Sequence, residues 1–219
     1  MSANVRPALS ALQLDTGFAR IPGDVACAET YSCEVELIRV PGAAVTGIVR
    51  GDPSSINIAP FEEALANAKG EVIATSCGFL SYWQAHLQAL TERPFVSSSL
   101  IGLPDLALRY APGEIMIVTF DAAALGPDHM CGCEQYLTSV IGLPRDNTLR
   151  RAIETDDVFE PARVEAELRD LIKQARGPKT KHIVFECTNL PPYTKAVRAA
   201  TGLQAVSYTH LTLPTNREV

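Results

Sequence analysis

Short apolar runs alternate with amphipathic segments along most of the chain. The runs at 72–75 and 114–120 have the length and apolar content of buried strands. The segments at 61–68 and 164–175 instead place an apolar residue at every third or fourth position, as one face of a helix does. Because parallel strands are joined by such helical crossovers, this alternation predicts an α/β fold with parallel sheets.

The same rules predict the remaining elements. Further strands are expected at 34–40, 95–99, 140–143 and 182–186, and further helices at 79–90 and 192–201 and from Gly126-Pro127-Asp128. The polar segment 145–159 is expected to be irregular, and 12–25 begins apolar and then becomes a loop.

Composition limits the kind of protein this is. The chain has 219 residues, is 47% hydrophobic and carries a net charge of −6. This acidic balance argues against a nucleic-acid partner, and no apolar run approaches the length of a membrane span. The beginning of the sequence lacks a secretory pattern, so a cytoplasmic protein is expected, with its six cysteines more often free, catalytic or metal-bound than in disulfides.

The last fourteen residues are treated separately. The segment 206–219 resembles the translation of a sequencing adapter, so it is set apart from the fold as a non-native tail. On this interpretation the natural chain is interrupted near Ala205, and Tyr208 and His210 are not candidates for site residues.

Two cysteines carry the most informative local pattern. Cys77 and Cys187 each end an apolar run, and each precedes a helix-like segment. Ligands of open α/β sheets bind beyond the carboxyl ends of the strands, and a helix N-terminus favours a thiolate. The pair therefore predicts two acid/base groups that face each other across a cleft. The alternative is that both are ordinary buried cysteines.

Three motifs resemble the aspartate/glutamate racemase superfamily, in an uncharacterised branch. They are Thr75-Ser-Cys-Gly-Phe-Leu80, Ser97-Ser-Ser-Leu100 and Glu186-Cys-Thr-Asn-Leu-Pro-Pro-Tyr193, and the Arg20-Ile-Pro-Gly-Asp24 loop matches the same branch. The resemblance covers about residues 12–205. It implies two pseudo-symmetric Rossmann-like lobes, 1–94 and 95–205, with parallel sheets and an active-site cleft between them. Where better-known glutamate racemases have Asn after the first cysteine, this chain has Gly78.

The resemblance also implies a reaction without a cofactor. Cys77 and Cys187 are expected to act as the two catalytic bases of a racemase or epimerase of a small amino acid or related carboxylate. The superfamily also includes hydantoin racemases, maleate isomerases and arylmalonate decarboxylases. A decarboxylase, a cis–trans isomerase and a non-catalytic carboxylate-binding module therefore remain alternatives, and a homo-oligomer is left open.

Residues around the cysteines are candidates for substrate binding. Backbone amides of Gly78 and Thr188 are expected to hold the substrate carboxylate. The side chains proposed to line or assist the pocket are Arg20, Asp24, Ser76, Phe79, Ser98, Ser99, Thr188 and Asn189. The alternative for the hydroxyl groups is ordinary capping, and for the two charged residues a surface position. Glu186 is expected to point away from the cleft, because side chains alternate along a strand.

A zinc site is the rival interpretation of the other cysteines. Cys27 and Cys33, together with His129, Cys131 and Cys133, offer zinc-binding side chains. Their spacing fits no common zinc motif, so no metal is expected.

Overall fold

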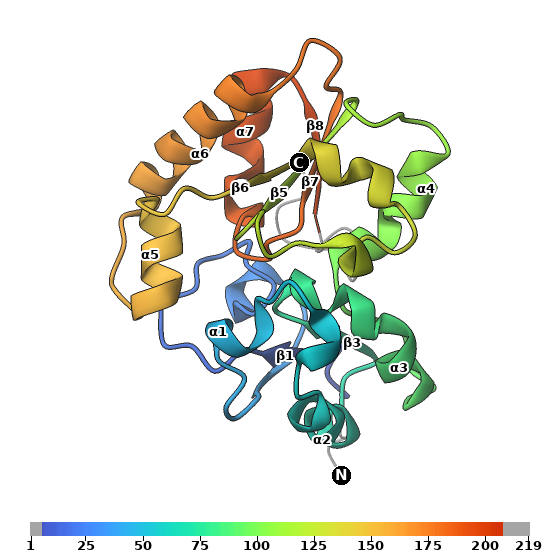
Figure 1. The fold of residues 1–219 in the computed structure, drawn as a ribbon. Coiled ribbons are helices and arrows are strands. Elements are labelled where there is room, and N and C mark those ends of the chain that lie inside the picture. Colours follow the sequence, from blue (N-terminus) through green and yellow to red (C-terminus); the bar gives the residue numbers. More distant parts are fainter. Residues whose placement is uncertain (1–5, 208–219) are drawn as a thin grey trace.

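Two parallel sheets with the same strand order form the protein (Figure 1). The structure is a computed structural model that describes residues 6–207. The first sheet has the order β2-β1-β3-β4 and the second the order β6-β5-β7-β8. Their strands are β1 (Leu9–Gln13), β2 (Val35–Arg39), β3 (Val72–Thr75), β4 (Phe95–Val96), β5 (Ile115–Thr119), β6 (Val140–Gly142), β7 (His182–Phe185) and β8 (Gln204–Ser207). This repeated topology confirms the predicted α/β fold of two pseudo-symmetric halves.

Helices cover the sheets with their apolar faces inward. The α-helices are α1 (Val45–Ile48), α2 (Ala59–Asn67), α3 (Gln84–Ala89), α4 (Leu103–Ala107), α5 (Thr148–Thr155), α6 (Pro161–Ala175) and α7 (Thr194–Thr201). In α6 the buried residues Val164, Leu168 and Ile172 are three or four positions apart, as the sequence pattern predicts. Strand β5 is buried along its whole length, which explains its unbroken apolar run. Within residues 6–207, no helix has both the length and the apolar character needed to cross a bilayer.

The segment after Cys77 and the segment 145–159 differ from their predicted structure. The segment after Cys77 begins as a 3₁₀ helix (η3, Gly78–Trp83) and becomes α-helical only at Gln84. The segment 145–159, expected to be irregular, contains α5. Its N-cap is Asn147, whose side chain accepts hydrogen bonds from the Leu149 and Arg150 amides, so a polar composition concealed a capped helix.

The boundaries of the halves also differ from the expected ones. Phe95 and Val96 form β4 and pair with β3, so they belong to the first sheet and not to the second half that was expected to begin at 95. Val206 and Ser207 extend β8 alongside β7, although the tail was expected to lie outside the fold from 206 onward. The rest of the tail, including Tyr208 and His210, lies outside the described residues.

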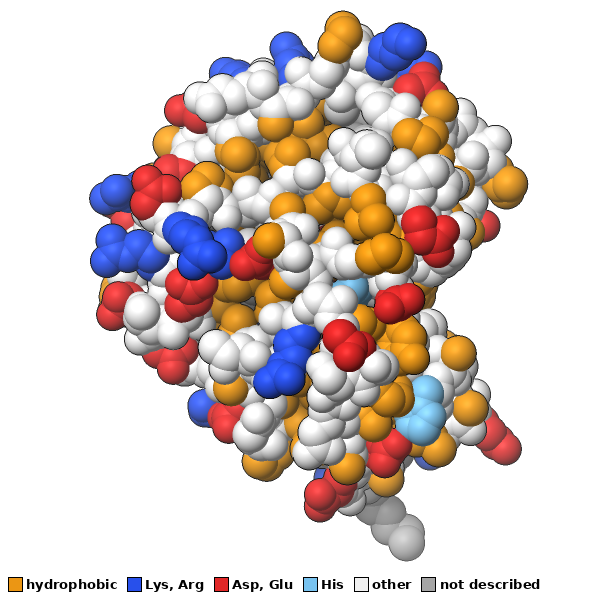
Figure 2. Space-filling model, viewed as in Figure 1, with side chains coloured by type: hydrophobic (Ala, Val, Ile, Leu, Met, Phe, Trp, Pro, Cys, Tyr) orange, Lys and Arg blue, Asp and Glu red, His pale blue; other side chains and the backbone are white. Residues whose placement is uncertain are grey.

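Direct contacts join the two halves near the ends of their central strands. The Ser99 hydroxyl donates to the Phe185 carbonyl oxygen at 2.8 Å, and the Thr188 hydroxyl donates to the Ser76 carbonyl oxygen at 2.6 Å. One apolar core extends through both halves, and apolar side chains gather in the hollow between them (Figure 2). The carboxyl ends of β3 and β7 therefore face the same interior space.

Candidate active site

Cys77 and Cys187 line one cavity between the two halves. The space between its walls is about 370 Å³, a volume that includes space open to solvent. Its walls are formed by Leu14, Thr16, Phe18, Arg20, Val45, Val49, Ser76, Cys77, Gly78, Phe79, Phe120, Ile153, Glu186, Cys187, Thr188 and Asn189. The residues Cys77 and Cys187 are 8% and 6% exposed, so both thiols are largely screened from water.

The strands explain why the two cysteines meet. Cys77 comes two residues after the end of β3, and Cys187 two residues after the end of β7. These strands hold the same place in their respective sheets, next to the central strands β1 and β5. The pseudo-symmetry therefore brings two positions far apart in sequence to one site.

Burial works against ionisation of both thiols. It is the main cause that raises the pKa of Cys77 to about 12 and that of Cys187 well above its ordinary value. The Glu186 carboxylate raises both values further, whereas the backbone amides of Phe79 and Asn189 oppose the rise at Cys77 and Cys187 respectively. The expectation that helix N-termini would favour thiolates is therefore wrong for the protein without a ligand. A turn of 3₁₀ helix at Gly78 is too short to offset complete burial.

Glu186 takes part in the site, contrary to the expectation that it points away. It is fully buried, lines the cavity and accepts a hydrogen bond from the Thr119 hydroxyl at 2.6 Å. Its other carboxylate oxygen, Oε1, has no hydrogen-bond partner among residues 6–207. Burial raises its pKa to about 7, although the Thr119 hydroxyl and the Phe120 amide act in the opposite direction. The strand β7 ends at Phe185, so strict alternation no longer holds at Glu186.

Gly78 provides the space that Glu186 occupies. A Cβ atom at position 78 would overlap the Glu186 carboxylate and lie 2.5 Å from the Glu186 backbone oxygen. Any side chain at this position would therefore force the two cysteine loops apart. The glycine that follows Cys77 is explained by this close approach.

Arg20 and Asp24 form a buried ion pair beside the cavity. Their side chains are 7% and 3% exposed, and one guanidinium nitrogen lies 3.1 Å from both Asp24 oxygens. Asp24 also accepts a hydrogen bond from the Asn189 amide, and the Cys187 sulfur lies 3.6 Å from Asn189 Oδ1. Arg20 itself lines the cavity, while Asp24 lies behind it. The surface alternative is therefore wrong for both residues, since each is buried.

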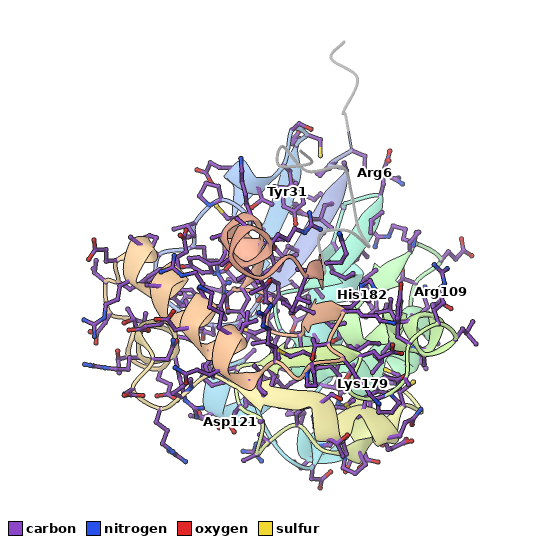
Figure 3. All side chains as sticks on the ribbon, turned by 90° about the horizontal axis from the view of Figure 1, so that it is seen from above. Arg6, Tyr31, Arg109, Asp121, Lys179 and His182 are labelled. Carbon is purple, nitrogen blue, oxygen red and sulfur yellow. The ribbon has the colours of Figure 1, made fainter. Side chains whose placement is uncertain are left out.

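Aromatic rings form much of the remaining wall. Phe18, Phe79 and Phe120 line the cavity, and the Arg20 guanidinium lies 4.7 Å from the centroid of the Phe18 ring. Arg150 lies 4.9 Å from the Phe120 centroid and also pairs with Asp121, which is labelled in Figure 3. An arginine guanidinium thus packs against two of the three rings.

The other predicted binding residues divide into two groups. Ser76, Gly78, Phe79, Thr188 and Asn189 line the cavity. The Ser98 hydroxyl instead accepts from the Leu100 amide as a helix cap, and Ser99 bonds to the second half. Neither serine is among the residues that line the cavity.

Several cavity residues were not found from the sequence. They are Leu14, Thr16, Phe18, Val45, Val49, Phe120, Ile153 and, as a cavity group, Glu186. Phe120 and Glu186 immediately follow β5 and β7. Because ligands bind beyond the carboxyl ends of parallel strands, this position in the sequence could have indicated that both residues line the cavity.

The candidate zinc ligands do not come together. Among residues 6–207, no group of three or more His, Cys, Asp or Glu side chains is placed to hold a metal ion. Cys33 is exposed, and the buried Cys27 donates a hydrogen bond to Glu29. His129 is buried against Phe79, and its Nδ1 accepts from the Gly126 amide.

Similarity to solved structures shows the fold. The chain superposes on allantoin racemase from Pseudomonas fluorescens with a TM-score of 0.61 and 14% identity, covering 91% of this chain and 85% of that one. On glutamate racemase from Bacillus anthracis it superposes with a TM-score of 0.55 and 12% identity, covering 91% of this chain and 76% of that one. On arylmalonate decarboxylase the TM-score is 0.53 and the identity 13%, covering 91% of this chain and 86% of that one. The chain has the racemase-type fold that the sequence motifs indicated.

Sequence similarity leads to a different class of enzyme. The chain is 29% identical over 213 residues to a dimethylsulfoniopropionate lyase from Durusdinium sp. clade D, covering 89% of this chain and 69% of that protein. It is 29% identical over 218 residues to dimethylsulfoniopropionate lyase 6 from Emiliania huxleyi (strain CCMP1516), covering 90% and 56%. The chain thus spans little more than half of the second relative. No model of a known protein family matches the sequence. These relatives are named as lyases, whereas the sequence motifs led us to expect an isomerase.

Proposed function

We propose that this protein is a lyase that removes a proton from the α carbon of a small carboxylate and expels a leaving group from the β carbon. Dimethylsulfoniopropionate is the proposed substrate. The observation that carries the proposal is that two thiols and a carboxylate share one secluded, largely apolar cavity. The similarity to dimethylsulfoniopropionate lyases over 89% of the chain supports the choice of substrate.

The reaction needs one base and no redox step. A thiolate takes the α proton, the electron pair of that C–H bond forms a double bond to the β carbon, and the β carbon–sulfur bond breaks. Dimethyl sulfide leaves with the electron pair of that bond, so the products are dimethyl sulfide, acrylate and one proton. Chemistry at an α carbon is shared with racemisation, which explains how one fold serves both reactions.

The cavity suits a substrate with an onium group at one end and a carboxylate at the other. A sulfonium ion donates no hydrogen bond, so aromatic faces such as those of Phe18, Phe79 and Phe120 are appropriate contacts. The buried Arg20 guanidinium and the backbone amides after Cys77 and Cys187 are donors for the carboxylate end. The substrate ends are therefore assigned to different parts of the wall.

The proposal is tested by product formation. Purified protein is supplied with dimethylsulfoniopropionate, and dimethyl sulfide is measured by gas chromatography. Release of dimethyl sulfide together with an equal amount of acrylate supports the proposal. Loss of the substrate without either product, or no loss at all, contradicts it.

A racemase or epimerase is the second candidate, because it gives both cysteines a role as bases. Two thiols that face one cavity are suited to removing a proton from one face of a carbon and returning one to the other. Its signature is inversion of a chiral amino acid or related carboxylate in deuterated water, with deuterium entering the α carbon. Under this candidate Cys77→Ser and Cys187→Ser each abolish inversion.

A further inference from the structure

Glu186 is a cavity group for which elimination by a thiolate alone has no use. It is one of the few carboxylates completely removed from solvent, and it carries no ion pair among the described residues. Within the described part of the chain its Oε1 atom has no hydrogen-bond partner, while Oε2 accepts a hydrogen bond from Thr119 of the neighbouring strand. A buried carboxylate with one oxygen lacking a partner among residues 6–207 costs stability, so its presence in the cavity that both thiols line requires an explanation.

Glu186 has a use because neither thiol ionises readily in its surroundings, and a protonated thiol needs a base. Burial and the nearby carboxylate both keep Cys77 and Cys187 protonated at neutral pH. Neutral thiols are poor bases, so the reaction needs a group that removes a thiol proton. Arg20 and Asp24, the other charged groups that act on the thiols, are paired with each other.

We infer that Glu186 is the proton acceptor that activates the cysteine pair, an inference that rests on the proposed α-proton chemistry. In the resting protein a single negative charge resides on Glu186 and both cysteines are thiols. When substrate binds, the S–H bond of one cysteine breaks and its proton forms an O–H bond with the Glu186 carboxylate. The resulting thiolate removes the α proton of the substrate, and Glu186 afterwards releases its proton to solvent.

The atoms and charges balance over this cycle. One proton leaves the substrate and one is released, while cysteine and glutamate return to their starting states. The Glu186 carboxylate is never ionised at the same time as a cysteine thiolate, which removes the repulsion that Glu186 exerts on both thiols. Gly78 is necessary in this arrangement because its missing side chain lets the carboxylate reach between the cysteine loops.

Three variants test the inference. Glu186→Gln keeps the shape of the side chain but accepts no proton. Thr119→Val removes the hydrogen bond that lowers the pKa of Glu186 and leaves the carboxylate in place. Gln84→Glu, at a residue that binds the Ser97 and Phe95 backbone outside the cavity, is a control for adding a carboxyl group elsewhere in the first half.

Two measurements are made on each variant: the pH dependence of dimethyl sulfide release, and the rate at which iodoacetamide alkylates Cys77 and Cys187. The wild type should lose activity on the acid side with a midpoint near the pKa of about 7. Glu186→Gln should lower turnover about 100-fold and remove the loss of activity on the acid side. It should nevertheless speed alkylation at high pH, because the negative charge that raises the pKa of both thiols is absent. Thr119→Val should move the midpoint to higher pH, and Gln84→Glu should leave it in place.

The outcomes separate this inference from the proposed function. If the wild type releases no dimethyl sulfide and exchanges no α proton, the proposed function fails. If the wild type is active but Glu186→Gln keeps its turnover and its acid limb, only the role of Glu186 is overturned. An increase in KM at unchanged kcat overturns it as well, and would instead make Glu186 a counter-ion for the substrate cation. Slower turnover together with slower alkylation would show a purely structural role.

Discussion

At the scale of single residues, the chemistry of the site depends on which of its buried groups is ionised. Two buried thiols and a buried carboxylate share a cavity with an arginine that is already paired. In surroundings of such low polarity, each additional negative charge raises the free energy of the protein. The proposed mechanism accordingly moves one negative charge between Glu186 and a cysteine and adds no second one.

Glu186 should make the stability of the protein depend on pH. Its pKa is raised from 4.5 to about 7, so the folded protein holds this proton more tightly than the unfolded chain does. Its contribution to stability is intact below about pH 4.5 and is lost as the pH rises through 7, at a cost of about 3 kcal/mol. Urea unfolding at pH 5 and pH 8 should show this decrease in the wild type and not in Glu186→Gln. Equal pH dependence in the two proteins would contradict the burial of an ionisable group here.

At the scale of elements, short turns and caps determine the shape of the cavity. The loop after β3 approaches the loop after β7 so closely that only glycine fits at position 78. Asp156 is the C-cap residue that follows α5, and its carboxylate accepts hydrogen bonds from the Gly17 and Phe18 amides at 2.7 and 2.9 Å. Each half thus fixes a loop that carries cavity residues of the other half.

The approach at position 78 predicts a large effect from a small substitution. Gly78→Ala should destabilise the fold by several kcal/mol, on the order of an overpacked core site, and abolish activity. Gly47→Ala is the matched control, because no described residue outside its immediate neighbourhood in the chain lies within 4 Å of the new Cβ. Thermal unfolding of both variants checks this expectation. A stable, active Gly78→Ala protein would show that the two loops are farther apart.

The end of α5 predicts a milder effect. Asp156→Ala removes both hydrogen bonds to the loop that carries Phe18 and Arg20, so substrate binding should weaken about tenfold, equivalent to about 1.4 kcal/mol. Asp156→Asn keeps an acceptor oxygen and suits the left-handed backbone at φ +57°, so it should lose much less. Steady-state KM values measure the difference. Equal KM values for the two variants would exclude a role for these bonds.

At the scale of the whole molecule, the site exists only because the two halves are together. Cys77 comes from the first sheet and Cys187 from the second, and bonds such as Thr188 to Ser76 cross between them. A ligand that fills the cavity should therefore stabilise the complete fold. Propionate, which has the carbon skeleton without the sulfonium group, should raise Tm and slow the alkylation of both cysteines. A rise in Tm without protection of the thiols would place the binding site elsewhere.

The sequence predicted the architecture better than the chemistry. Apolar runs and helical spacing located most elements, and the repeated cysteine motif indicated a shared cleft. The same reasoning missed α5, whose helix depends on the Asn147 cap and on packing of Ile153 that no polar composition reveals. It also misjudged Glu186 and the ionisation of the thiols, because both depend on burial between segments distant in sequence.

The most direct test of the account is a proton NMR experiment in deuterated water with dimethylsulfoniopropionate and the wild type, Cys77→Ser or Cys187→Ser. The account predicts that the wild type forms dimethyl sulfide and acrylate, and that at least one of the two cysteine variants, the one that lacks the base, is slower by about 100-fold or more. Undiminished product formation in both variants, or a wild type that neither eliminates nor exchanges the α proton, would contradict the claim that this thiol cavity performs α-proton chemistry.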